Sequence, residues 1–223
     1  MVILLSGLPA SGKTTTAERL HATLGGVLIR QCDVYQRLGI DLRAWVRRTH
    51  GFTRDTEEYV RLRDEAYAAM REELATALGA GAELAIVDAV YGESEKRRAV
   101  YETCATHRHP ALVVWCRCDD SNEVRRRFAA RAGRDEPEHE ADDFSIYRNL
   151  RSLWTPPVDD RLPDGTPVPV VVYDTGIVNR TVVPCPSVLS IVSSPPCAMT
   201  RCLTIASPSP VPPSSRDRAL STR

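Results

Sequence analysis

The segment from Gly7 to Thr14, GLPASGKT, constrains the fold of this 223-residue chain more than any other feature. It matches the pattern G-x-x-x-x-G-K-[S/T] without a gap. A short apolar run, Val2 to Leu5, precedes it. A helical pattern from Thr14 to Leu24 follows it and ends at Gly25 and Gly26. A strand, a glycine-rich loop and a helix in this order are typical of the start of a parallel α/β sheet.

Short apolar runs alternate with longer helical patterns along most of the chain, as expected for parallel strands joined by crossover helices. The runs are hydrophobic throughout rather than at every second residue, so the strands should be buried on both faces. We therefore predict an α/β fold of three layers, with a five-stranded parallel sheet flanked by helices. The five predicted strands are Val2–Leu5, Val27–Ile29, Leu84–Val87, Leu112–Trp115 and Val170–Tyr173.

Apolar side chains recur at helical spacing between the second and third strands, from Tyr59 to Leu78. Asp55 and Glu58 suit the beginning of this helix, and Gly79 suits its end. Further helices are expected from Ser94 to about His107 and from Asp120 or Ser121 to about Ala132, with a surface loop over residues 133–143.

The residue types of the glycine-rich segment suit a site for phosphate groups. Gly7 and Gly12 allow backbone N–H groups to turn inward, and the N-terminus of the following helix adds partial positive charge. Lys13 is placed to reach the β- and γ-phosphates of a nucleotide, and the hydroxyl of Thr14 to bind Mg²⁺. The alternative is a glycine turn with an incidental lysine. The residues expected to hold the nucleotide are Gly7, Pro9, Ala10, Ser11, Gly12, Lys13, Thr14 and Thr15.

The composition changes abruptly at Ile177, beyond which eight prolines are interleaved with serines. We predict that residues 1–176 form the folded domain and that residues 177–223 form a disordered Pro/Ser-rich tail. A reading-frame or cloning artefact is an alternative origin of this tail. The 29 basic and 29 acidic residues of the chain balance, but five arginines and one aspartate lie in the tail. The predicted domain is therefore acidic, which gives no electrostatic reason to expect a nucleic-acid binder.

Seven cysteines without regular spacing favour a reducing environment over disulfide bonding. No apolar run reaches 18 residues, and the short apolar start lacks the basic leader of a signal peptide. We therefore expect a soluble, cytoplasmic protein with no membrane partner.

Several motifs occur in an order and spacing that resemble a known family. They are LLSGLPASGKTT at the start, IRQCD with Asp33, IVDAVY with Asp88, RRRFAARAGR, and VVYDT with Asp174 and Thr175. Over about residues 1–176 the chain resembles the small P-loop kinases of the AAA type, relatives of polynucleotide 5′-kinase, gluconate kinase, chloramphenicol phosphotransferase and zeta-toxin kinases. The resemblance implies the three-layer fold of P-loop NTPases and kinases, with ATP and Mg²⁺ as cofactors.

The resemblance also implies roles for two acids at the ends of predicted strands. In these kinases an Asp just past the second strand faces the acceptor hydroxyl as general base or orienter, and Asp33 stands at that position. Asp88, at the end of the third strand, is expected to hold Mg²⁺ through water or to contact the acceptor. The alternative for both is an acid that bonds to the next turn of the chain. The sequence departs from the family pattern at Gln36, where arginine is common, and at Val90, where a small hydroxyl residue is usual.

Arg127 and Arg131 are spaced i, i+4, so they share one face of a predicted helix. In the family, lid arginines of this kind clamp the nucleotide and neutralise charge in the transition state. Both are therefore expected to bind the nucleotide, and Arg131 to act in catalysis. The alternative is an Arg-rich surface helix. Further candidates are Asp174 and Thr175, near the adenine end of the site, and Arg97 and Arg98, facing the acceptor. The alternative for Arg97 and Arg98 is that at least one of them is a solvated charge on a helix.

Together these features predict a phosphotransferase that moves the γ-phosphate of Mg-ATP to a hydroxyl of a small metabolite. Its catalytic residues would be Lys13, Asp33 and Arg131, and its metal site Thr14 with Asp88. One alternative is a polynucleotide 5′-hydroxyl kinase that grips a nucleic-acid end with Arg37, Arg43, Arg47, Arg48 and Arg54. Another is a nucleotide-dependent switch that hydrolyses ATP slowly and transfers nothing. The acidic domain favours the small metabolite, and the sequence leaves the acceptor and the oligomeric state open.

Overall fold

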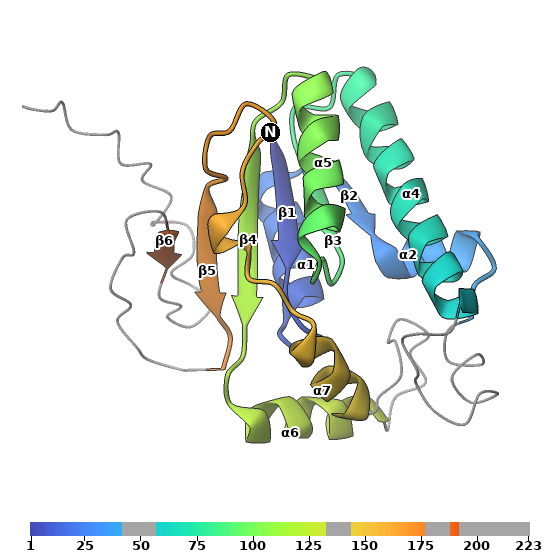
Figure 1. Cartoon of the computed structure of the whole chain (residues 1–223), viewed down its shortest axis with the longest axis vertical. Coiled ribbons are helices and arrows are strands. Elements are labelled where there is room, and N and C mark those ends of the chain that lie inside the picture. Colours follow the sequence, from blue (N-terminus) through green and yellow to red (C-terminus); the bar gives the residue numbers. More distant parts are fainter. Residues whose placement is uncertain (42–56, 133–143, 177–187, 192–223) are drawn as a thin grey trace, which may run out of the picture.

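The computed structural model describes residues 1–41, 57–132, 144–176 and 188–191. They form one parallel sheet in the order β2-β3-β1-β4-β5-β6, with helices on both of its faces (Figure 1). The central strand is β1, which pairs with β3 on one side and with β4 on the other. The strands are β1 Val2–Ser6, β2 Val27–Arg30, β3 Ala85–Asp88, β4 Ala111–Arg117, β5 Val170–Asp174 and β6 Val188–Ile191.

The five-stranded parallel sheet predicted from the apolar runs is confirmed by β1 to β5. The edge strand β6 is an addition, which pairs with β5 in parallel register from Val170↔Val188 to Tyr173↔Ile191. For these four residues the structure shows a strand where the sequence analysis predicted disorder. The sequence VLSI is apolar enough to extend the edge of a sheet despite the flanking prolines. The rest of 177–223 lies outside the described residues, and the domain boundary at 176 stays a prediction.

Side chains of β1 alternate between the two faces of the sheet and so define the layers. Val2 and Leu4 are buried in a core that includes side chains of α4 (Glu57–Gly79) and α5 (Ser94–Thr106). Ile3 and Leu5 are buried on the other face, where Ala17 of α1 (Lys13–Leu24) covers them. The predicted three-layer arrangement is therefore confirmed.

The predicted helices are present with small changes at their ends. α5 begins at Ser94, as predicted, and Glu93 occupies the cap position before it. α6 (Ser121–Ala132) is capped by the Asp120 carboxylate, which accepts the N–H groups of Asn122 and Glu123 at 2.9 and 3.3 Å. Two helices were not predicted, α2 (Gln31–Arg37) and α7 (Phe144–Ser152). None of the described helices combines the length and the apolar character needed to cross a bilayer.

A buried ion pair joins α5 to the chain that follows α7. The guanidinium of Arg97, whose side chain has no exposed surface, contacts both carboxylate oxygens of Asp160 at 2.5 and 2.8 Å. It also donates to the carbonyls of Tyr91 and Thr155 at 2.9 and 2.8 Å. Arg97 therefore holds two loops together and does not face an acceptor. Arg98, the other candidate, is exposed and lies 3.5 Å from the carboxylate of Glu102.

Candidate active site

The strand ends bring the predicted site residues together at one edge of the sheet. In the register of the sheet, Asp88 at the end of β3 is the partner of Leu5 in β1 and of Arg30 in β2. The glycine-rich loop, which follows β1, therefore begins beside Asp88. The helices α6 and α7 lie beyond this same edge (Figure 1). Parallel α/β sheets bind their ligands at the carboxyl ends of their strands, so this edge is the place to look for a site.

Gly7 and Gly12 of the loop lie where the backbone approaches other groups too closely for a side chain. A Cβ atom on Gly7 would lie 2.4 Å from the carbonyl oxygen of Cys116, a distance that backbone atoms cannot tolerate. Gly12 has φ +83°, and its Cβ atom would lie 3.3 Å from the methyl group of Thr175. Ala10, between them, also has a positive φ of 63°. The loop thus keeps a tight, left-handed path that larger residues would distort.

Lys13 is the first residue of α1, and its side chain is 9% exposed. Its ammonium group donates to the carbonyl oxygen of Leu8 at 2.9 Å, so the side chain reaches across the loop. The hydroxyl of Ser11 is buried without a hydrogen-bond partner. A buried ammonium, a helix N-terminus and an unsatisfied hydroxyl in one loop form a cradle suited to an anion such as phosphate.

Thr14 and Asp88 form a pair beside this cradle. The hydroxyl of Thr14 donates to Oδ2 of Asp88 at 2.8 Å, whereas Oδ1 of Asp88 is buried and has no partner. Burial raises the pKa of Asp88, although the charge of Lys13 and the hydrogen bond from Thr14 oppose the shift. A buried carboxylate with an unused oxygen next to a hydroxyl offers the hard oxygen ligands that Mg²⁺ prefers. The two residues therefore fit the predicted magnesium site.

Asp33 lies in the first turn of α2 and is held by Arg30. The guanidinium donates to both carboxylate oxygens of Asp33, at 2.9 and 2.8 Å, and to Glu18 at 3.1 Å. Because Arg30 is the register partner of Asp88, the pair stands next to the predicted magnesium site. The sequence placed Asp33 correctly at this edge but could not show that a neighbouring cation binds both of its oxygens.

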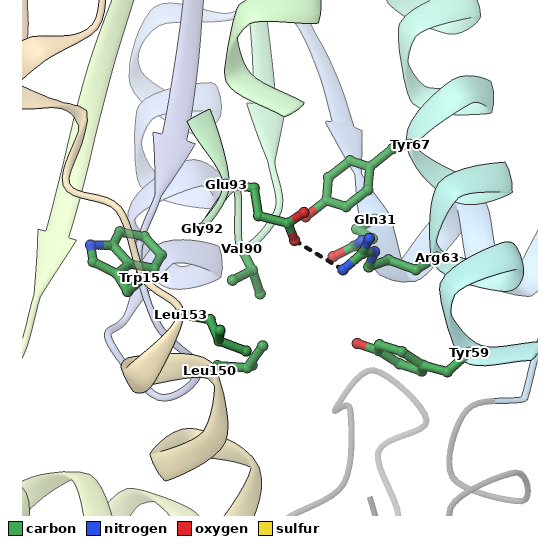
Figure 2. A pocket seen from close by; sticks show the side chains of 10 residues that line it. All are labelled: Gln31, Tyr59, Arg63, Tyr67, Val90, Gly92, Glu93, Leu150, Leu153 and Trp154. Atoms are coloured by element: carbon green, nitrogen blue, oxygen red, sulfur yellow. Dashed lines mark hydrogen bonds and ion pairs between the residues drawn. The ribbon is translucent and has the colours of Figure 1, made fainter. Parts of the chain in front are cut away.

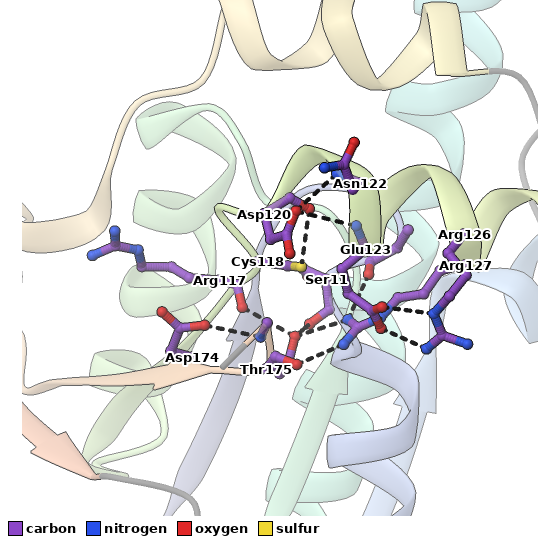
Figure 3. A network of polar contacts seen from close by, with 12 residues as sticks. Ser11, Arg117, Cys118, Asp120, Asn122, Glu123, Arg126, Arg127, Asp174 and Thr175 are labelled. Atoms are coloured by element: carbon purple, nitrogen blue, oxygen red, sulfur yellow. Dashed lines mark hydrogen bonds and ion pairs between the residues drawn. The ribbon is translucent and has the colours of Figure 1, made fainter. Parts of the chain in front are cut away.

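Arg127 binds the outside of the glycine-rich loop (Figure 3). Its guanidinium donates to the carbonyl of Ala10 at 2.9 Å, and to the hydroxyl and carbonyl of Thr175 at 2.9 and 2.6 Å. Glu123, one turn earlier in α6, accepts a further bond at 2.8 Å. These contacts join α6 to the loop, and a contact of Arg127 with the nucleotide itself stays a prediction. Arg131 lies on α6, but its side chain is outside the described part of the structure.

Thr175 supports the loop from the end of β5, a role that the sequence analysis missed. Its hydroxyl lies within hydrogen-bond distance of the carbonyls of Ser11 and Arg117, at 2.8 and 3.0 Å (Figure 3). The expectation that Thr175 and its neighbour Asp174 lie near the adenine stays a prediction, whereas the described contacts are made to the protein. The VVYDT motif at a strand end was the only signal for this position.

A pocket opens beside the cradle (Figure 2). Four parts of the chain contribute to it: the start of α2, one side of α4, the loop between β3 and α5, and the end of α7 with the two residues that follow. The backbone connects it to the cradle, because the N–H of Gly7 donates to the carbonyl of Val90 at 3.1 Å. Its lining residues are Gln31, Tyr59, Arg63, Tyr67, Val90, Gly92, Glu93, Leu150, Leu153 and Trp154.

Most of these pocket residues carried no recognisable signal in the sequence. α7 was detectable in principle, because Tyr147 and Leu150 are three residues apart and both are buried. Trp154 precedes the segment Thr-Pro-Pro, and nothing in that local sequence points to a pocket. Its place in the pocket depends on Gly92, whose Cβ atom would lie 3.1 Å from the indole. The proximity of these two residues cannot be read from their separation of 62 positions in the chain.

A glycine-rich phosphate cradle at the first strand of a three-layer parallel sheet defines the P-loop nucleotide-binding proteins, and here the fold is that of the kinase-like branch. The comparison with family models agrees with this class. The chain belongs to the AAA domain family, whose model matches residues 2–153. No curated protein matches the chain.

Solved structures share the fold. A protein described as a kinase, from Chloroflexus aurantiacus, is 20% identical, with a TM-score of 0.54 over 78% of this chain and 85% of that one. Kti12 from Chaetomium thermophilum, in complex with ADP-AlF3, is 22% identical, with a TM-score of 0.56 over 78% and 89%. A gluconokinase from Sinorhizobium meliloti is 16% identical, with a TM-score of 0.52 over 79% and 83%. At these identities the similarity shows the kinase-like fold alone.

Proposed function

We propose that this protein transfers the γ-phosphoryl group of Mg-ATP to a hydroxyl of a small metabolite bound in the pocket of Figure 2. One observation carries the proposal: the loop after β3 belongs to both the cradle and the pocket. The carbonyl of Val90 accepts the N–H of Gly7, while the side chain of Val90 lines the pocket. An acceptor in the pocket would therefore lie next to the terminal phosphate of a nucleotide in the cradle.

Each proposed site residue has a role that follows from its position. Lys13 would neutralise charge on the β- and γ-phosphates, and Thr14 and Asp88 would hold Mg²⁺, which supplies further charge neutralisation when it is bound. Asp33, oriented by Arg30, would accept the proton of the acceptor hydroxyl.

The transfer conserves atoms and charge in a simple way. The acceptor oxygen forms a bond to the γ-phosphorus as the bond from that phosphorus to the bridging oxygen breaks, and ADP leaves. The proton of the acceptor hydroxyl passes to the Asp33 carboxylate. Arg127 and Arg131 would close over the nucleotide and exclude water, which would otherwise accept the phosphoryl group.

Transfer from γ-labelled ATP to a panel of small alcohols tests this proposal. Replacing Lys13 with alanine is expected to reduce the transfer rate by at least about 100-fold, because removal of one charge-stabilising group typically costs that much. Arg19→Ala is a matched control, since Arg19 is an exposed cation on the same helix. Equal transfer by the Lys13 and Arg19 variants would refute the mechanism.

The described residues give no support to the nucleic-acid alternative. Of the arginines expected to grip a nucleic-acid end, Arg37 forms an ion pair with Glu73 of α4. The other four, Arg43, Arg47, Arg48 and Arg54, lie outside the described residues. A small acceptor therefore remains the function that the described geometry supports best.

A further inference from the structure

The pocket beside the cradle has two chemically different walls (Figure 2). One wall is apolar and consists of Val90 with Leu150, Leu153 and Trp154. In Figure 2 the side chains of α4 face this wall from the opposite side, with Tyr59 pointing toward the two leucines. A ligand that satisfied both walls would place an apolar surface against α7 and its hydrogen-bonding groups toward α4.

Among the described residues that line the pocket, Arg63 is the one cation, and its charge is already matched. Its guanidinium binds Glu93 at 2.9 Å and Asp64 at 3.1 Å, and only 13% of the side chain is exposed. Asp64 in turn binds Lys96 at 2.9 Å. These two cations and two carboxylates have a net formal charge of zero. An anionic ligand would therefore have to displace Glu93 from Arg63 or lie against its carboxylate.

The electrostatics of this cluster favour keeping it intact. Burial opposes the charge of Arg63, but Glu93 and Asp64 outweigh burial and raise the pKa of Arg63. Burial also opposes the charge of Asp64, but hydrogen bonds from Lys96 and Arg63 lower the pKa of Asp64. These four groups thus stay ionised and paired, and the part of the polar wall that the structure describes stays neutral.

Two aromatic rings that line the pocket, one in each wall, are held in fixed positions. The Trp154 indole packs against Gly92, where a Cβ atom would lie 3.1 Å from the ring. The Tyr67 hydroxyl accepts the N–H of Tyr91 at 3.2 Å, and the two tyrosine rings lie 5.1 Å apart. Rigid aromatic and branched surfaces bind the flat, apolar face of a ring at low entropic cost.

From this geometry we infer that the acceptor is an uncharged, ring-bearing alcohol. Its ring lies against Leu150, Leu153 and Trp154, and its polar groups point toward α4. The inference rests on the proposed phosphotransfer and adds the chemical class of the acceptor to it. It excludes sugar acids and phosphorylated compounds as good acceptors, because each adds a negative charge next to Glu93.

Matched pairs of acceptors test the inference with the full-length protein and γ-labelled ATP. Adenosine is compared with adenosine 3′-monophosphate, phenyl β-glucoside with phenyl β-glucuronide, and 1,3-propanediol serves as an alcohol without a ring. The neutral ring compound of at least one pair is expected to have a kcat/KM at least about tenfold above those of its anionic partner and of propanediol. A higher kcat/KM for the anionic member of both pairs, or for propanediol, overturns the inference but leaves the proposed phosphotransfer in place. Absence of transfer to every acceptor refutes the phosphotransfer and the inference together.

A charge variant examines the role of Glu93 directly. Glu93→Gln keeps the shape of the side chain and removes the carboxylate that matches Arg63, so the kcat/KM ratio of anionic to neutral acceptor is expected to rise about tenfold. Glu95→Gln is the matched control, because Glu95 is exposed on the same helix and does not line the pocket. An unchanged ratio in Glu93→Gln, or an equal rise in both variants, contradicts the inference.

Discussion

Replacing Thr175 with valine removes one hydroxyl and nearly preserves the shape of the side chain. The hydroxyl donates one proton, shared between the carbonyls of Ser11 and Arg117, and accepts one bond from Arg127. A neutral hydrogen bond contributes about 1 kcal/mol, and a bond from a charged donor about 1.5–3 kcal/mol. Arg127 keeps its bonds to the carbonyls of Ala10 and Thr175, so only part of the second amount is lost. We expect the free energy of unfolding to fall by about 2 kcal/mol, which lowers Tm by roughly 4–8 °C for a domain of this size.

The same substitution should weaken nucleotide binding, because the lost bonds hold the Ser11 carbonyl and therefore the path of the cradle. If about 1.4 kcal/mol of the loss acts on the loop, the Kd for ATP rises about tenfold. Urea denaturation and isothermal titration with Mg-ATP measure the two effects. Thr175→Ser is the control, since it keeps the hydroxyl and loses only the methyl group beside Gly12. A valine variant with the wild-type Kd and stability would show that Thr175 does not support the cradle.

Two further predictions concern buried groups. Arg97→Met is expected to lower the free energy of unfolding by about 3–5 kcal/mol, because it leaves the buried carboxylate of Asp160 without its cation. Arg98→Met is the control and should change the free energy of unfolding by less than about 0.5 kcal/mol. Equal urea midpoints for the two variants would contradict this prediction. Burial raises the pKa of Cys104 to about 11 and that of Cys116 to about 12, so both remain neutral thiols at pH 8. Iodoacetamide at pH 8 should therefore leave them unlabelled in the folded protein while it labels the half-buried Cys32, as mass spectrometry would show.

Much of the fold was predictable because it depends on short-range patterns. Continuous apolar runs located β1 to β5 because a strand covered on both faces needs no polar side chains. α4 was placed within two residues at its start and ended at Gly79 as predicted. α7 was missed because it is short and follows a charged segment without periodicity. The edge strand β6 was missed because the surrounding prolines suggested disorder.

The part of the candidate site that could be predicted is the glycine-rich loop, because its function depends on local backbone geometry. Gly7, Gly12 and Lys13 occupy the positions that their spacing required. Arg97 shows where such reasoning fails, because its partner Asp160 lies 63 residues away in the chain. Nothing in the local sequence distinguishes a guanidinium that will be buried in an ion pair from one that will face a ligand.

By itself, the sequence determined the strand, loop and helix of the phosphate cradle and the positions along the chain of the five parallel strands β1 to β5. These features follow from local backbone preferences and from the period of apolar side chains, which act over a few residues. Only the tertiary structure decided the partner of each charged side chain and the composition of the pocket. Arg63 became part of a neutral cluster, and Arg127 a support for the cradle, because folding brought Glu93 and the carbonyl of Ala10 from distant segments within hydrogen-bond distance. The same cation can bind a ligand or the protein, and its three-dimensional neighbours determine which.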